Sequence, residues 1–130
     1  MKGAVIALAV ALALPAVADP LDTAQPLECV FAEAAQCDGA AQCESVEHAQ
    51  IDLPESMLID LDKKTLKAST ADRASAMDIL KAEESVILMS GNREGRGWVV
   101  VVDRTTGHFT ATITEQGGAF VFAGICGVAP

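Results

Sequence analysis

The clearest pattern in the chain is a set of short apolar runs in its last third, separated by turn residues. The segments "GWVVVVD", "HFTATIT" and "AFVFAGIC" are rich in β-branched and aromatic residues, and the connections "RTTG" and "EQGG" contain glycines suited to tight turns, such as Gly107. Phe109, Ala111 and Ile113 alternate with polar residues, which predicts a strand with one buried face. The apolar run 98–102 predicts a strand that is buried on both faces or central in a sheet. We expect a three-stranded antiparallel meander here.

Upstream, the pattern is weaker but of the same kind. "LECVFAEA" and "ESVEHAQI" predict two strands, "SMLIDL" and "TLKAS" predict a hairpin around "DKK", and "SVILMSG" predicts a strand leading to Trp98. Residues 69–84 fit either a helix or a strand, and we expect a helical turn followed by a strand. About seven to eight short strands, with one short helix at most, predict an all-β fold. Its form would be a small antiparallel up-and-down barrel or sandwich, stapled by disulfides.

The first eighteen residues have the pattern of a signal peptide. Lys2 precedes an unbroken apolar stretch from Ala4 to Leu14, and the small residues Ala16 and Ala18 come before Asp19. The apolar stretch is shorter than the roughly 20 residues that a membrane-spanning helix needs. The pattern predicts cleavage near Ala18, export to the periplasm or the medium, and a single β domain over residues 19–130.

The four cysteines are Cys29, Cys37, Cys43 and Cys126. An even number of cysteines in an exported chain indicates a disulfide framework. Metal or redox use is the minor alternative, because the spacings of eight and six positions match neither zinc-ligand pairs nor a C-x-x-C motif. We therefore expect structural disulfides, with no metal and no cofactor.

Four cysteines allow three pairings, and chain entropy does not separate them. Cys37 and Cys43 enclose a short polar loop that a disulfide can close without straining a strand. Cys29 shares its strand face with apolar neighbours two positions away, and Cys126 shares its face with the phenylalanines of the last strand. If both faces point inward, the pairs are Cys29–Cys126 and Cys37–Cys43.

The chain is strongly acidic, and this net charge disfavours some classes of binding partner. The chain has a formal net charge of −9, and residues 19–130 carry −10 because Lys2 is the only charged side chain before them. Such a chain is repelled by phosphate backbones and anionic lipid surfaces. We expect no nucleic-acid binding and no membrane insertion, and a basic exported protein would be the favoured partner.

Catalytic motifs are not evident. His48 and His108 stand apart from any nucleophile motif, and the two aspartates of "IDLDKK" lack the rest of a calcium loop and predict a solvated hairpin instead. Asp103 and Arg104 could pair in a pocket, but charges at a strand end beside a turn are usually solvated. Trp98, the only tryptophan, is expected to plug the core or one end of the barrel.

The ending "VVVVDRTTGHFTATI…FVFAGIC" resembles that of a loose group of short exported bacterial β proteins. They share a cysteine near the start of the mature chain, a D-R-x-T-G hairpin and a terminal G-x-C. The resemblance implies a small exported β domain and no particular activity. The overall plan is also similar to that of small barrel proteins that inhibit lysozyme or proteases, an analogy of fold alone.

These patterns favour a non-catalytic, protein-binding or inhibitory module that uses its polar loops. The expected contact residues are Asp38, Gly39, Gln42, Asn92, Arg93, Glu94 and Arg96. The alternative is a lipocalin-like carrier of a small apolar ligand, and a small hydrolase is the least favoured reading. A barrel packed solid by its aromatic residues would exclude the carrier, whereas a lumen of several hundred Å³ would support it.

Overall fold

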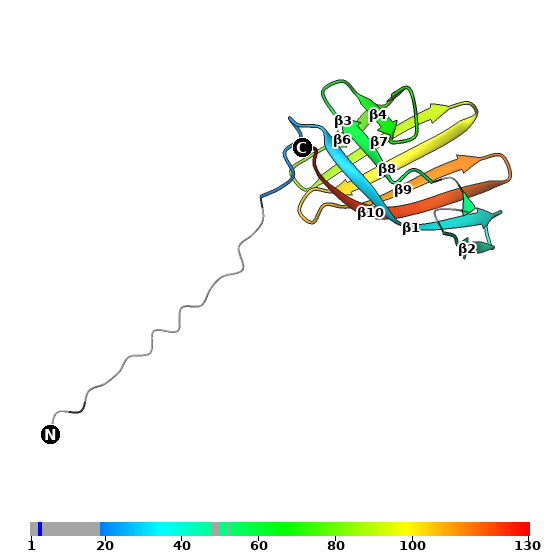
Figure 1. Cartoon of the computed structure of the whole chain (residues 1–130), viewed down its shortest axis with the longest axis horizontal. Helices are drawn as coiled ribbons and strands as arrows, with labels where there is room; N and C mark the ends of the chain where they lie inside the picture. The colour runs from blue at the N-terminus through cyan, green and yellow to red at the C-terminus, as the bar shows by residue number, and fades with distance from the viewer. Residues whose placement is uncertain (1–2, 4–18, 48–49, 52) are drawn as a thin grey trace.

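The computed structural model describes residue 3 and residues 19–47, 50–51 and 53–130 (Figure 1). The predicted signal peptide, residues 1–18, lies outside the described residues except for Gly3, and so does His48. The strands are β1 (Leu27–Asp38), β2 (Cys43–Ser45), β3 (Ser56–Asp60), β4 (Thr65–Ala68), β5 (Ser75–Ala76), β6 (Asp78–Ala82), β7 (Val86–Arg93), β8 (Arg96–Asp103), β9 (His108–Glu115) and β10 (Gly118–Val128).

These strands form one antiparallel sheet in the order β5-β4-β3-β1-β10-β9-β8-β7-β6, with β2 paired to β1. Strands β1 and β10 pair along almost their whole length, from Leu27 opposite Val128 to Asp38 opposite Gly118. The strands at the two ends of the order, β5 and β6, are separated in the chain only by Met77. The sheet is therefore a nearly closed up-and-down barrel, and its seam lies between β5 and β6.

The two ends of the barrel differ. The end that we call proximal carries the turns at 61–64 and 104–107 and lies beside the C-terminus and the N-terminal lead-in (Figure 1). The end that we call distal carries the turns at 94–95 and 116–117. The β7–β8 turn is built from Glu94 and Gly95, whose φ angles are 52° and 79°. Two positive φ angles are the signature of a two-residue type I′ hairpin turn, which matches the twist of paired strands.

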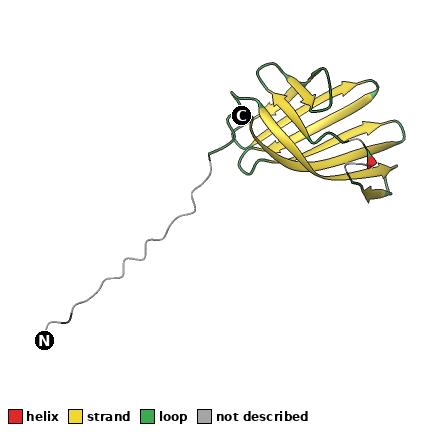
Figure 2. Ribbon diagram, viewed as in Figure 1, coloured by secondary structure: helices red, strands yellow, loops and turns green. Residues whose placement is uncertain are grey.

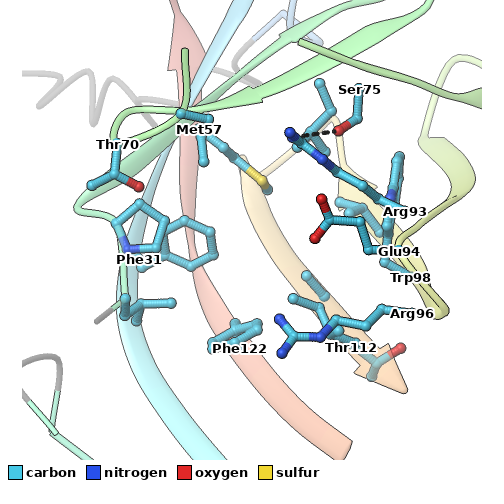
Figure 3. Close-up of a pocket in the computed structure, with 18 of the residues that line it drawn as sticks. Phe31, Met57, Thr70, Ser75, Arg93, Glu94, Arg96, Trp98, Thr112 and Phe122 are labelled. Carbon is cyan, nitrogen blue, oxygen red and sulfur yellow. Dashed lines mark hydrogen bonds between the residues drawn. The ribbon is translucent and has the colours of Figure 1, made fainter. Parts of the chain in front are cut away.

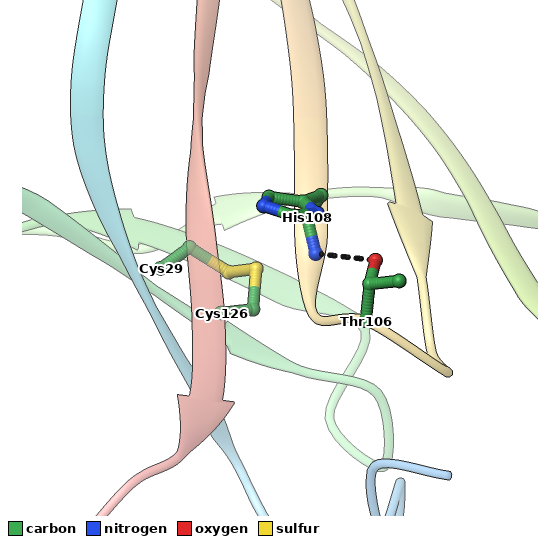
Figure 4. The surroundings of a disulfide bond; sticks show 4 residues. All are labelled: Cys29, Thr106, His108 and Cys126. Carbon is green, nitrogen blue, oxygen red and sulfur yellow. Dashed lines mark hydrogen bonds between the residues drawn. A yellow bond between two sulfur atoms is a disulfide. The ribbon is translucent and has the colours of Figure 1, made fainter. Parts of the chain in front are cut away.

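Both disulfides have the predicted pairing. Cys29 bonds Cys126 and Cys37 bonds Cys43, so the described residues contain no free cysteine. Cys29 and Cys126 are directly opposite each other in β1 and β10, and both point into the core (Figure 4). Cys43 lies opposite Cys37, at the start of β2. Two structural disulfides indicate an oxidising compartment.

Strand β8 confirms one of the two alternatives that its apolar run predicts. Val100 and Val102 are buried, but Val99 and Val101 are 40% and 39% exposed, so burial on both faces is wrong. The strand is instead central in the sheet, between β7 and β9. Its outer valines face solvent because a barrel of one sheet buries only its inner face.

The predicted second strand, 44–51, forms only at its start; the other described residues of this range, 46–47 and 50–51, are not in a strand. Strand β2 covers only Cys43–Ser45, and Gln50 belongs to a short 3₁₀ turn (Figure 2). The reason is competition for the edge of β1. Strand β3 pairs with Leu27–Val30, so β2 has to pair farther along β1, which it does over the segment 35–37.

The helical turn predicted at the start of 69–84 is absent from the structure. Residues 69–74 form turns and bends, followed by β5 and β6. Strand β5 pairs with β4, strand β6 pairs with β7, and the Met77 N–H donates to the carbonyl of Lys64 at 3.0 Å. A helix here would leave the edges of β4 and β7 unpaired, so sheet closure outweighs a weak three-residue periodicity. These short strands bring the number in the described residues to ten instead of seven or eight.

The D-R-T-T-G segment is a structural clamp at the proximal end. The Asp103 carboxylate accepts backbone hydrogen bonds from Thr105 and Thr106 at 2.9 and 3.2 Å, and Gly107 has a φ angle of 83°. The Arg104 guanidinium donates to the carbonyls of Leu21 and Glu83, at distances as short as 2.7 Å. The motif therefore shapes a turn and holds the lead-in across this end of the barrel.

The clamp gives a prediction about acid stability. Hydrogen bonds from the backbone N–H groups of Thr105 and Thr106 hold the pKa of Asp103 below its usual value, and the bond from Thr105 has the larger effect. Because its pKa is lower in the folded state, the Asp103 carboxylate stabilises the fold at pH values above its unfolded pKa of about 3.9. This contribution is lost as the pH falls through the folded pKa. Urea unfolding should therefore show Asp103→Asn less stable than the wild type near neutral pH, with the gap closing as the pH falls below the unfolded pKa of about 3.9. A gap that is independent of pH would contradict this role for the carboxylate.

Candidate functional site

The barrel interior is filled toward its proximal end and hollow toward its distal end. Leu27, Ile59, Ile87, Met89 and Val102 have no exposed surface, and they fill the proximal part. Beyond them lies a cavity of about 300 Å³, which we call the lumen cavity. Its lining includes residues of β1, β3, β4, β5, β7, β8, β9 and β10, together with the segments that precede β3 and β5. A volume of this size is at the lower limit of known small-molecule sites.

An aromatic cluster forms one wall of the lumen cavity. Phe31 and Phe122 line it, with ring centroids 5.5 Å apart in an edge-to-face arrangement, and Phe31 packs against Phe109 in the same way. Gly124 lies opposite both Phe31 in β1 and Phe109 in β9. A Cβ at this position would overlap the Val30 carbonyl and the Phe109 ring. The glycine thus allows the rings to pack beside the cavity.

Trp98 packs against the core, as expected, and its side chain also forms part of the opposite wall of the cavity. Its indole lies directly over Gly91, its cross-strand partner, and a Cβ on Gly91 would overlap the six-membered ring. The side chain is half-buried and lines the lumen cavity. Because the chain contains one tryptophan and no tyrosine, Trp98 gives an intrinsic optical signal from this cavity.

Charged side chains gather where the cavity meets solvent. Arg73, Arg93, Glu94 and Arg96 all line it. In Figure 3 the Arg96 side chain extends toward Phe122, and the Glu94 carboxylate points into the space between Arg93 and Arg96. The arrangement is an apolar chamber whose rim carries three guanidinium groups and one carboxylate.

The rim guanidinium groups are only partly satisfied by the protein. The Arg96 Nε pairs with the Glu115 carboxylate at 2.9 Å, and one Arg93 terminal nitrogen lies 3.4 Å from the Ser75 hydroxyl (Figure 3). Among the described residues, neither Arg73 nor Arg93 forms an ion pair. Hydrogen-bonding capacity therefore remains at the rim for a bound molecule.

The predicted contact loops lie at the same end of the barrel but do not form one surface. Arg93, Glu94 and Arg96 belong to the lumen cavity, whereas Asn92 is exposed and outside its lining. The disulfide loop is also outside it, and there the Asp38 N–H donates to the carbonyl of Gln42 at 2.8 Å.

Within the disulfide loop, Gly39 has a φ angle of 77° and is exposed. Asp38 contributes to a separate depression of about 150 Å³ beside the β9–β10 turn. The structure therefore divides the predicted contact residues between two places.

The histidines do not extend the site. His108 is exposed on β9, where its backbone N–H donates to the Thr106 hydroxyl at 3.2 Å, and it is the smallest of the causes that lower the pKa of Asp103 (Figure 4). His48 lies outside the described residues. In the described part of the chain, no three histidine, cysteine or acidic residues are grouped so that they could hold a metal ion. The two aspartates of "IDLDKK" flank the β3–β4 turn, where Asp60 accepts a hydrogen bond from the Lys63 N–H at 3.0 Å.

Comparison with known proteins adds no assignment. No protein-family model matches the sequence, and neither a curated protein nor a solved structure is significantly similar to it. The resemblance to short exported bacterial β proteins stays a prediction. Within the described residues, no helix has the length and apolar character that crossing a bilayer requires.

Sequence reasoning missed several residues of the cavity. Arg73 and Leu53 lie in irregular segments, and nothing in their local pattern aims them at the lumen. Arg93 and Arg96 have a detectable signal, because each continues the inward-facing alternation of its strand, past Gly91 and Trp98 respectively. An arginine at the end of an inward-facing row is a sign of a charged barrel mouth.

Proposed function

We propose that this protein is a non-catalytic, exported binding protein that holds a small, largely apolar ligand in its lumen cavity. The observation that carries the proposal is a cavity of about 300 Å³ in the distal part of a barrel whose proximal part is solid. The walls are mainly apolar and the polar groups lie at the rim, the usual composition of a ligand site. After cleavage near Ala18, the protein would act in the periplasm or the medium.

Protein binding through the distal loops was the first hypothesis from the sequence, and the geometry supports it less well. Three of the seven predicted contact residues, Arg93, Glu94 and Arg96, line the cavity instead of a convex contact surface. Specific protein interfaces bury about 800 Å² on each partner. A surface that binds a basic partner would need a negatively charged area of this size. The "NREGRG" loop does not provide one, because it contributes two arginines against one glutamate.

The size of the cavity limits the ligand. An engineered protein cavity of about 150 Å³ accepts benzene, so a cavity of about 300 Å³ accommodates roughly twelve carbon atoms. Burial contributes about 0.8 kcal/mol per methylene, or about 6 kcal/mol for an eight-carbon chain before the cost of association. Because the cost of association must still be subtracted, we expect weak binding of a simple eight-carbon ligand, with a Kd no tighter than about 0.1 mM.

Titration of the purified, disulfide-bonded protein with 1-octanol tests the proposal, with Trp98 emission as the signal. The emission should change and saturate, because the indole borders the cavity. The matched control is 1,8-octanediol, which has the same chain but must bury a hydroxyl at its inner end, so it should bind at least tenfold more weakly. No saturable change with octanol by emission, together with no binding heat by calorimetry, would overturn the proposal.

A further inference from the structure

The arginines of this acidic protein are concentrated at one place. The chain contains four, and three of them, Arg73, Arg93 and Arg96, line the lumen cavity. The fourth, Arg104, binds backbone carbonyls at the proximal end. Since the whole chain has a net charge of −9, the rim of the cavity is a local reversal of its charge.

Two of these arginines face each other across the β7–β8 hairpin. Arg93 and Arg96 are directly opposite in the strand register, on either side of the two-residue turn. Like charges directly opposite on one face of a sheet are destabilising unless a counter-charge separates them. The Glu115 carboxylate pairs with the Nε of Arg96. The remaining guanidinium nitrogens of Arg93 and Arg96 are not paired with Glu115.

The nearby counter-charges leave a net positive rim. Glu94 is the one acidic side chain in the cavity lining, against three arginines, and Glu115 pairs with Arg96 from outside that lining. Counting both carboxylates, one positive charge remains, and the guanidinium groups of Arg73 and Arg93 have no ion-pair partner among the described residues. Guanidinium groups bind carboxylates through parallel hydrogen bonds, an interaction stronger than one between neutral groups.

We infer that the ligand is an amphipathic carboxylate, with its apolar tail among Phe31, Phe122 and Trp98 and its head group at Arg73 and Arg93. This inference rests on the proposed binding function and specifies its ligand class. The apolar wall and the guanidinium rim are contiguous in one cavity, so a single short molecule meets both. Cavity size sets the tail at about eight to ten carbons.

The test compares three ligands of equal chain length, octanoate, octanol and octylammonium, by Trp98 emission at neutral pH. Octanoate should bind about tenfold more tightly than octanol, and octylammonium should bind most weakly. The advantage of octanoate should shrink as salt is added, because the rim is open to solvent.

Charge variants identify the groups responsible. The double variant Arg73→Gln/Arg93→Gln should bind octanoate no more tightly than it binds octanol. Glu94→Gln should strengthen octanoate binding up to about threefold. The matched control is Lys67→Gln/Lys81→Gln, which also removes two positive charges but from exposed positions outside the cavity, and its octanoate affinity should equal that of the wild type.

The outcomes separate this inference from the proposed function. Equal binding of octanoate and octanol, or tightest binding of octylammonium, would overturn the inference and leave the proposed function standing. Failure of all three ligands to bind would overturn both. A loss of octanoate binding in the lysine control equal to that in the arginine variant would also overturn the inference, because it would show a dependence on overall charge alone.

Discussion

Replacing Ala111 with phenylalanine is expected to weaken octanol binding by at least tenfold while changing the free energy of unfolding by less than about 1 kcal/mol. Ala111 is 5% exposed, lines the lumen cavity, and lies opposite Val100 and Phe122 in the neighbouring strands. A phenyl ring occupies about the volume of a benzene-sized cavity, ~150 Å³, which is half of the space available. Because the ring would enter empty volume, it should not cause the strain that overpacking a filled core produces.

The measurements are a Trp98 emission titration and urea unfolding. The matched control is Ala123→Phe, the same substitution on an outward-facing position of β10, next to Phe122. The control should bind octanol like the wild type. Wild-type binding by Ala111→Phe would show that the ligand lies elsewhere, and a destabilisation of several kcal/mol would show that the distal lumen has no room for a ring.

Removing the Cys29–Cys126 bond is expected to have the largest effect on stability. The bond closes a loop with a sequence separation of 97 residues, and the chain-entropy relation gives about 4.7 kcal/mol for a loop of that length. A domain of this size is typically stable by about 5–15 kcal/mol, so the double variant Cys29→Ala/Cys126→Ala should be only marginally folded. Urea unfolding, followed by far-ultraviolet circular dichroism, measures the loss.

The second disulfide provides the control. Cys37–Cys43 closes a sequence separation of six, for which the same relation gives about 2.2 kcal/mol. Its removal frees only the short strand β2, so Cys37→Ala/Cys43→Ala should lose about half as much stability and keep octanol binding. Equal losses from the two double variants would contradict the assignment of Cys29–Cys126 as the principal staple.

Where side-chain alternation is strong, the fold follows from the sequence. Phe109, Ala111 and Ile113 turn the same face inward, as their spacing predicts, and the C-terminal meander forms in the expected strands. The disulfide pairing follows from the same reasoning, because two inward-facing cysteines on paired terminal strands must meet. Local pattern is sufficient where one face of a strand is buried and the other is not.

Prediction fails where pairing partners decide the structure. In residues 69–84 the predicted strand forms, but the helical turn expected before it does not, because β5 and β6 are needed as partners for two strand edges that close the barrel. The run 98–102 allows either burial on both faces or a central position, and only the central position holds, because its outer valines have no second layer to pack against among the described residues. The lumen cavity is even harder to predict from the sequence, because it depends on the volumes of side chains from eight strands and on the approach of Arg73 from a loop.

Intermolecular nuclear Overhauser effects from bound octanoate show directly whether the ligand lies in the distal lumen. We expect contacts from the terminal methyl of octanoate to the rings of Phe31 and Phe122, and contacts from its first methylene to the side chain of Arg93. Contacts to the outward-facing Val30 and Ile125, which are 50% and 54% exposed, with none to the lumen rings, would contradict this location.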